Sequence, residues 1–258
     1  MKYYVVDAFS EQPFGGNPAG VCLLDRRIED GLMQKIAFEN NLSETAFLVK
    51  REGYYDLRWF TPEAEIDLCG HATLGSAHIL MSYVDRTMEK VDFHTLSGVL
   101  TVTKDGDYYT MDFPSRKPVA CKKPDLLEEA LGIKVLETYC SRDLLAIVES
   151  DQAVAAIKPD FSLLSKLKDV YAVIVSAKGT DCDFVSRFFI PNVGIPEDPV
   201  TGSSHTELIP FWSERLSKTE LTARQLSRRG GYLKCRDLGE RVLISGKAVT
   251  YLEGELLV

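Results

Sequence analysis

The segment from Gly70 to Val84 predicts a helix with apolar side chains on nearly every side, namely Ala72, Leu74, Ala77, Ile79, Leu80 and Met81. A helix on a protein surface carries one apolar stripe, whereas a helix that is apolar all round is buried. The sequence therefore predicts a helix in the interior of its own domain, with the rest of that domain packed around it.

Strands outnumber helices on both sides of this segment. Short apolar runs bounded by turn residues predict strands at 3–9, 19–24, 45–50, 55–60, 91–95, 98–103, 108–113, 138–140, 144–148, 172–175, 184–190, 232–235, 242–246, 248–252 and 255–258. Helical spacing predicts helices at 30–38, 125–131 and 203–216, the last kinked by Pro210. A Pro- and Lys-rich stretch, 114–124, is typical of a linker. We expect an α+β protein with domains 1–114 and 115–258, whose last strand can cross back to the first domain.

Two segments share one pattern. Residues 60–78 and 188–205 each contain aromatic and proline residues, acidic residues, a Gly-rich turn and Gly-Ser-x-His. The Phe-x-Pro and Gly-Ser-x-His elements imply offsets that differ by two residues, so the register of the repeat stays open. Leu96-Ser-Gly98 and Ile244-Ser-Gly246 also resemble each other. The pattern indicates a duplicated turn-to-helix unit whose two helix N-termini face one cleft, and free N–H groups there suit an anion.

Composition excludes several classes of function. The 258 residues are 45% hydrophobic and 26% charged, which is typical of a soluble globular protein. The net charge of −8 disfavours nucleic acid as a partner. No apolar run reaches the roughly 20 residues that span a bilayer, and the N-terminus has no signal-peptide pattern. We expect a cytoplasmic protein that binds neither nucleic acid nor a membrane.

The six cysteines, at positions 22, 69, 121, 140, 182 and 235, are scattered and form no C-x-x-C pair. This spacing favours reduced thiols over a disulfide framework. Most are expected to act as small core hydrophobes. Cys69 differs because it lies in a Gly-His turn.

Two candidate acid–base residues come from the first half. Glu44 stands where a loop turns into an apolar strand, and partial desolvation there suits a carboxyl group to accept and return a proton near neutral pH. Its alternative role is to bind the backbone of a turn. His71 follows Cys69-Gly70 at a predicted helix N-terminus, which should lower its pKa and leave a neutral ring. Its alternative is a satisfied, half-buried histidine.

A third candidate, Asp198, precedes Pro199 and so cannot be helical. Its side chain either projects into the cleft or braces the turn. The spacing of Cys69 and His71 lacks the further ligands of a zinc site, and no nucleotide-binding motif is present. We therefore expect neither a metal nor a cofactor.

Seven short motifs, in order over essentially the whole chain, resemble those of the PhzF family, the phenazine-biosynthesis-like isomerases whose fold is related to diaminopimelate epimerase. They are Val6-Asp-Ala-Phe9, Gly16-Asn-Pro18, Asn41-Leu-Ser-Glu-Thr-Ala-Phe47, Arg58-Trp-Phe-Thr-Pro62, Cys69-Gly-His-Ala-Thr73, Glu197-Asp-Pro-Val-Thr-Gly-Ser203 and Gln225-Leu-Ser-Arg-Arg-Gly-Gly231.

This resemblance implies two similar domains, each a curved, mostly antiparallel sheet around a central helix, with the active site in the cleft between them. It also implies a proton-shuttling role for Glu44, with His71 and Asp198 as the other catalytic residues. The matching substrate-binding residues are Asn17, Gly70, Gly202 and Ser203. The substrate would be a small carboxylate, and a homodimer is possible.

Two alternatives remain open. The related epimerases use two opposed cysteines. Cys69 fits the first position, but the second falls near Pro199, where the sequence has no thiol. An amino-acid or hydroxy-acid epimerase would therefore need another base. A metabolite-binding protein without chemistry is the other alternative, although it would not need Glu44, His71 and Asp198 together.

Overall fold

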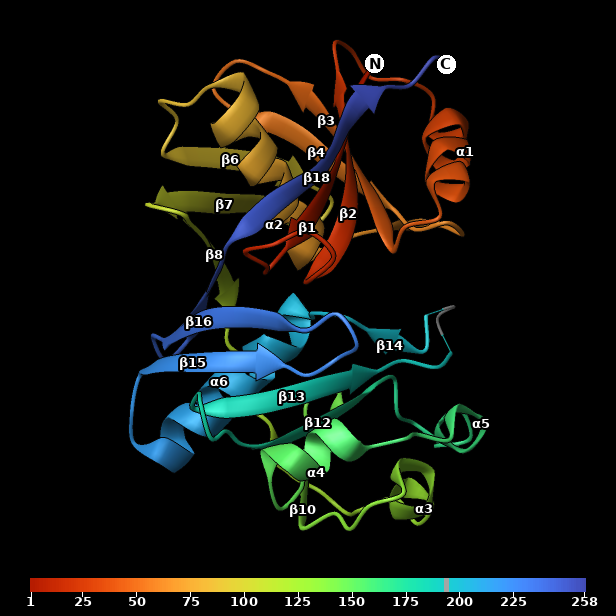
Figure 1. Ribbon diagram of the computed structural model, residues 1–258, viewed down its shortest axis with the longest axis vertical. Helices are drawn as coiled ribbons and strands as arrows, with labels where there is room; N and C mark the ends of the chain where they lie inside the picture. The colour runs from red at the N-terminus through yellow and green to blue at the C-terminus, as the bar shows by residue number, and fades with distance from the viewer. Residues whose placement is uncertain (193–194) are drawn as a thin grey trace. The chain divides into compact units, whose positions relative to one another are not determined.

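A computed structural model describes residues 1–192 and 195–258 of the chain. The chain divides into two compact units (Figure 1). Unit 1 comprises residues 1–112 and 245–258, and unit 2 comprises residues 113–244. Gly194, which lies within the second repeated segment, is outside the described residues.

Unit 1 is built on a mostly antiparallel sheet in the order β18-β1-β2-β3-β4-β6-β7-β8. Among the described strand pairs in this order, β2–β3 and β4–β6 are parallel, and the short β5 pairs with β4. The strands are β1 (Lys2–Ala8), β2 (Asn17–Leu24), β3 (Glu44–Lys50), β4 (Tyr55–Phe60), β5 (Glu65–Ile66), β6 (Lys90–Thr95), β7 (Gly98–Asp105), β8 (Tyr108–Pro114) and β18 (Ala248–Glu255).

Each parallel pair of unit 1 is joined through a helix. α1 (Asp30–Asn40) connects β2 to β3, and α2 (Gly70–Ile79) lies between β4 and β6 and continues as the π-helical turn η1 (Leu80–Val84). Eight of the ten residues of α2 are buried, and the helix packs against β1, β2, β3, β7 and β18. The prediction of an interior helix is confirmed.

Unit 2 repeats this plan. Antiparallel pairs join β9 to β10 and β10 to β11, β12 to β13 and β15 to β16, and the parallel pairs are β11–β12 and β13–β15. The short β14 pairs with β13. The strands are β9 (Val119–Ala120), β10 (Glu137–Cys140), β11 (Leu144–Ile147), β12 (Val173–Lys178), β13 (Phe184–Phe189), β14 (Glu197–Asp198), β15 (Glu220–Gln225), β16 (Gly231–Asp237) and β17 (Arg241–Gly246).

The central helix of unit 2 is α6 (Gly202–Leu216), which contains Pro210 and has eleven of fifteen residues buried. Figure 1 shows β12, β13 and β15 side by side, with α6 behind them. The remaining helices are α3 (Leu127–Leu131), α4 (Asp151–Ala156) and α5 (Phe161–Leu164). The helices α4 and α5 and the strands β9, β14 and β15 were not expected from the sequence, and β18 covers the strand expected at 248–252 and ends at the first residue of the one expected at 255–258.

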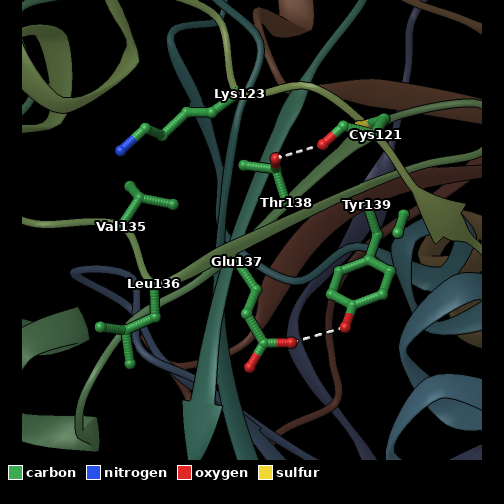
Figure 2. A pocket seen from close by; sticks show the side chains of 8 residues that line it. Cys121, Lys123, Val135, Leu136, Glu137, Thr138 and Tyr139 are labelled. Atoms are coloured by element: carbon green, nitrogen blue, oxygen red, sulfur yellow. Dashed lines mark hydrogen bonds between the residues drawn. The ribbon is translucent and has the colours of Figure 1, made fainter.

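The prediction of six reduced cysteines is wrong for one pair. Cys121 and Cys140 form a disulfide in unit 2, while Cys22, Cys69, Cys182 and Cys235 are free. Pairing of β9 with β10 brings the two cysteines together across 19 residues, with their Cα atoms 5.8 Å apart, which is an ordinary separation for a disulfide. Figure 2 shows Cys121 at the edge of a pocket along β10, where its carbonyl accepts a hydrogen bond from Thr138.

Candidate active site

Unit 1 brings Glu44, His71, Cys69 and Asn17 together. Glu44 is the first residue of β3, Asn17 begins β2, and Cys69 and His71 flank Gly70 at the start of α2. Glu44 Oε2 lies 3.0 Å from His71 Nε2. On the other side of the ring, His71 Nδ1 lies 3.1 Å from Asn17 Nδ2 and 3.5 Å from Cys69 Sγ. Side chains from three separate segments thus contact or carry one imidazole ring.

The Glu44 side chain has one buried carboxyl oxygen and is itself partly accessible. Glu44 Oε2 and His71 Nε2 are both buried and, among the described residues, have no polar partner other than each other. The Glu44 side chain nevertheless keeps 15% of its exposure, compared with 6% for His71. That exposure lies on atoms other than Oε2, so part of the side chain stays open to a bound molecule while Oε2 contacts His71.

The expectation of a neutral His71 ring is wrong. Burial, the largest influence, opposes charge on the ring, but the neighbouring Cys69 and Glu44 side chains outweigh it and raise the pKa of His71 well above its ordinary value. A nearby opposite charge exceeds the effect of a helix terminus, which is typically below 1 kcal/mol at exposed sites. His71 therefore holds a proton beside Glu44.

Cys69 is a buried thiol. Burial, followed by the negative charge of Glu44, raises its pKa. The reactive form of cysteine is the thiolate, which an apolar, acidic environment disfavours. Cys69 is therefore not activated as a nucleophile.

The remaining unit 1 histidines lie apart from this group. His78 is bound through Nδ1 to the Tyr109 hydroxyl and through Nε2 to the Thr250 hydroxyl, each at 3.0 Å, and burial lowers its pKa to about 4. His94 stacks on Tyr54, with ring centroids 3.8 Å apart. Both have structural roles.

In unit 2, Asp198 lies in β14, three residues before Thr201, the N-cap of α6. The Thr201 hydroxyl donates a hydrogen bond to the Asp198 carboxylate. Gln225, fully buried at the end of β15, accepts a hydrogen bond from Thr201 N–H at 2.9 Å and donates to the Asp198 carbonyl at 2.7 Å and to the Thr201 hydroxyl at 3.1 Å. One amide side chain thus fixes the turn that carries Asp198.

Gly202 and Ser203 are the first two residues of α6, as Gly70 and His71 are of α2. Neither N-cap residue, Cys69 or Thr201, makes a side-chain capping hydrogen bond. Uncapped N-terminal N–H groups are the usual means by which a helix binds an anion. Both helix starts therefore have the form that the predicted carboxylate contacts require.

The two units use the same bracing ion pair, and it settles the register of the repeat. Arg58 on β4 binds both oxygens of Glu65 on β5, at 2.6 and 2.7 Å. Arg187 on β13 binds both oxygens of Glu197 on β14, at 2.7 and 2.9 Å. Phe60 and Phe189 oppose these glutamates across the strand pairs, and the arginines lie over the same two rings, at 5.2 and 4.9 Å.

In each unit the helix begins five residues after this glutamate, so Gly70 corresponds to Gly202. Of the two alignments left open, the Gly-Ser-x-His alignment is therefore excluded, whereas the Phe-x-Pro alignment places Phe60 opposite its true counterpart, Phe189. The position equivalent to Cys69 is Thr201, the other N-cap residue, rather than a residue near Pro199. The second unit consequently offers a hydroxyl where a symmetric epimerase would need a thiol.

A second repeated hydrogen bond supports this register. The Ser97 hydroxyl donates to the Asp67 carbonyl, and the Ser227 hydroxyl donates to the Pro199 carbonyl, each at 2.8 Å. Asp67 and Pro199 both lie three residues before the first helical glycine. The counterpart of Leu96-Ser97 is therefore Leu226-Ser227, and the resemblance of Leu96-Ser-Gly98 to residues 244–246 does not reflect the repeat.

Two buried carboxyl groups meet in unit 2, that of Glu207 on α6 and that of Asp143 directly before β11. Glu207 Oε1 accepts a hydrogen bond from Asp143 N–H at 3.2 Å. Glu207 Oε2 and both Asp143 carboxyl oxygens are buried without a hydrogen-bond partner among the described residues. Burial raises the pKa of Asp143 to about 6, against the charges of Arg142 and Arg116. Burial and then the charge of Asp143 raise the pKa of Glu207 to about 7.

This pair predicts that Glu207→Gln stabilises the protein selectively at alkaline pH. The proton on folded Glu207 contributes stability that is complete below about pH 4.5 and lost as the pH rises through about 7. At pH 8 we expect the variant to exceed the wild type by about 2 kcal/mol in the free energy of unfolding, with little difference at pH 4.5. Urea unfolding at both pH values measures this, with the exposed Glu220→Gln as control. An equal difference at both pH values would refute it.

The fold and the site together define a duplicated, epimerase-like α+β protein with a buried Glu44–His71 contact in its first unit. Residues 6–254 match the family model described as phenazine biosynthesis-like protein. The chain belongs to this family, PhzC/PhzF. It is 51% identical to an uncharacterized isomerase of Pseudomonas aeruginosa, over 99% of this chain and 98% of that protein.

Solved structures agree. A PhzF-family protein of Enterococcus faecalis is 49% identical, with a TM-score of 0.98 over 100% of this chain and 99% of that one. A hydroxyproline epimerase from Agrobacterium vitis matches with a TM-score of 0.64 over 98% of this chain and 91% of that one, at 11% identity. This last likeness shows the fold alone. In the described residues, no helix is both long and apolar enough to span a membrane.

Proposed function

We propose that this protein is an isomerase that moves a proton within a small carboxylate-containing substrate, without a cofactor, and that Glu44 is its acid–base. Family membership and the isomerase name of the P. aeruginosa relative support the reaction class. The observation that carries the assignment is the Glu44–His71 contact of 3.0 Å, with one carboxyl oxygen buried against the ring and the side chain still partly exposed.

In this proposal the Glu44 carboxylate removes a proton from a substrate carbon and returns it to another carbon on the same face. His71, charged beside it, stabilises the carboxylate before proton transfer and the developing negative charge during it. On the other side of the ring the Asn17 amide, with its oxygen turned toward Nδ1, accepts the second N–H of the charged ring and orients it. Asp198, Gly70, Gly202 and Ser203 are proposed to position the substrate and its carboxylate, a role consistent with the two uncapped helix starts.

The epimerase alternative requires a second base opposite the first. The register of the repeat disfavours it, because the counterpart of the Cys69 thiol is Thr201, whose hydroxyl is engaged with Asp198. A binding protein without chemistry would have no use for a protonated imidazole held against a carboxylate. The proton-shift isomerase therefore remains the best-supported function.

The test begins with a thermal-shift screen of small carboxylates, followed by proton NMR of each hit for turnover. A single turnover in deuterium oxide then distinguishes the alternatives by mass spectrometry. If one carboxyl group removes and returns the hydrogen, a fraction of the product should keep the original hydrogen and the rest should gain at most one deuterium. A two-base epimerase would incorporate solvent deuterium almost completely, and a binding protein would move no hydrogen.

We also predict that Cys69→Ser keeps most of its turnover. The thiol is buried, its pKa is raised and its counterpart is not a thiol, so it has no part in the one-carboxylate mechanism. Steady-state kinetics on a confirmed substrate measures this. Complete loss of turnover in a folded variant that still binds substrate would restore the epimerase alternative.

A further inference from the structure

The side chains around His71 also have the composition of a soft-metal site. Glu44, Cys69 and His71 each present a ligand atom within 4.8 Å of the others. Thiolate and imidazole together favour zinc over magnesium or calcium, which prefer oxygen ligands. The family resemblance assigns no metal to these residues, so the question is whether their geometry suits one.

The two ring nitrogens of His71 face different side chains of this cluster. Glu44 contacts Nε2, whereas Cys69 Sγ lies on the Nδ1 side. One ion cannot bind both ring nitrogens, so a metal shared with the sulfur must bind Nδ1. Glu44 then accepts the Nε2–H hydrogen bond, which is the carboxylate–histidine–metal arrangement common in zinc proteins.

The separation of the ligand atoms fits this position. With ordinary Zn–S and Zn–N bond lengths and a tetrahedral angle, the two ligand atoms lie about 3.6 Å apart. Cys69 Sγ and His71 Nδ1 are 3.5 Å apart, so both could bind with little rearrangement. The Asn17 amide, 3.1 Å from Nδ1, brings its oxygen toward the ion when the amide group turns over.

We propose that Cys69 and His71 form a zinc-binding site, with Glu44 orienting the ring and the Asn17 amide as a third donor. Binding forms Sγ–Zn and Nδ1–Zn bonds, and the protons on the thiol and on Nδ1 pass to solvent. The bound ion takes the place of the proton on Nδ1, while the Nε2–H continues to donate to Glu44. Because this site includes Asn17 and His71, both placed in the proposed machinery, zinc is a reversible inhibitor of the proposed reaction rather than a cofactor for it.

Isothermal titration of the reduced protein with zinc alone tests the site without reference to catalysis. We expect one equivalent to bind, affinity to fall at least tenfold in Cys69→Ser, and affinity to fall about 10- to 100-fold in Glu44→Gln, which removes the second-shell carboxylate. Cys182→Ser, which removes another free thiol, is the matched control and should bind as the wild type does. Magnesium should not bind at this site.

Cobalt(II) provides an independent measurement. A thiolate–cobalt charge-transfer band in the near ultraviolet should appear in the wild type and in Cys182→Ser, and should be absent in Cys69→Ser. Thermal unfolding of each variant verifies its fold. Equal zinc affinity in the wild type and in folded Cys69→Ser, or a cobalt band that survives that substitution, would overturn the proposal whether or not the protein is an isomerase.

Discussion

Glu44→Gln should lower turnover by about 10²–10⁴, the range typical of losing a general acid–base. Glutamine keeps the size of the side chain and can still accept a hydrogen bond from His71 Nε2, 3.0 Å away in the native protein. It cannot take a proton from carbon at neutral pH. The loss should therefore appear in kcat, with substrate binding largely retained. Steady-state kinetics on a substrate confirmed by NMR measures it.

Two observations make this result specific. Glu39→Gln alters an exposed carboxyl group on the neighbouring α1 and should leave kcat unchanged. The thermal midpoint of Glu44→Gln should remain close to that of the wild type, because glutamine still accepts a hydrogen bond from Nε2 and His71, unlike an arginine, can release its proton when the carboxylate is removed. Near-normal turnover in folded Glu44→Gln would exclude Glu44 as the acid–base.

The sequence predicts the unit 1 site well because its residues lie in compact motifs at element boundaries. Glu44 begins a strand, and Cys69 and His71 begin the buried helix, as expected. The charge state of His71 could not be predicted, because it depends on Glu44, which comes from another strand. Contacts across the fold, rather than local position, decide such a pKa.

The unit 2 turn shows where sequence patterns fail. Gln225 forms hydrogen bonds with Thr201 and Asp198, which lie 24 and 27 residues before it in the chain. A short sequence pattern cannot predict a contact between residues so far apart. Its strand, β15, was missed because its buried positions are Leu221, Ala223 and Gln225, and alanine and glutamine are weak strand signals.

The short helices α4 and α5 were missed for another reason. They have only six and four residues, too few to show a period. Their starts are fixed instead by the side chains of Ser150 and Asp160, which accept hydrogen bonds from backbone N–H groups. The Cys121–Cys140 disulfide was also not predicted. The sequence separation of its cysteines does not reveal the strand pairing that brings them together.

Arg187→Ala should destabilise unit 2 by about 3 kcal/mol, because breaking a buried ion pair leaves its partner charge uncompensated. The Arg187 side chain is 10% exposed and binds both oxygens of Glu197. It also donates to the Ile157 carbonyl at 2.7 Å and covers the Phe189 ring. The substitution removes all of these contacts at once. The strand β14, which carries Asp198, then loses the ion pair that holds it against β13.

Urea unfolding measures the loss, and Arg51→Ala is the control because the Arg51–Asp56 pair is exposed and should contribute less than about 1 kcal/mol. Arg187→Lys should be intermediate, since lysine keeps the charge but not the two-pronged geometry. The double variant Arg187→Met/Glu197→Leu separates charge from packing. If the unpaired Glu197 carboxylate causes the loss, removing both charges should recover much of the stability. A double variant as unstable as Arg187→Ala would instead assign the loss to the contacts with Ile157 and Phe189.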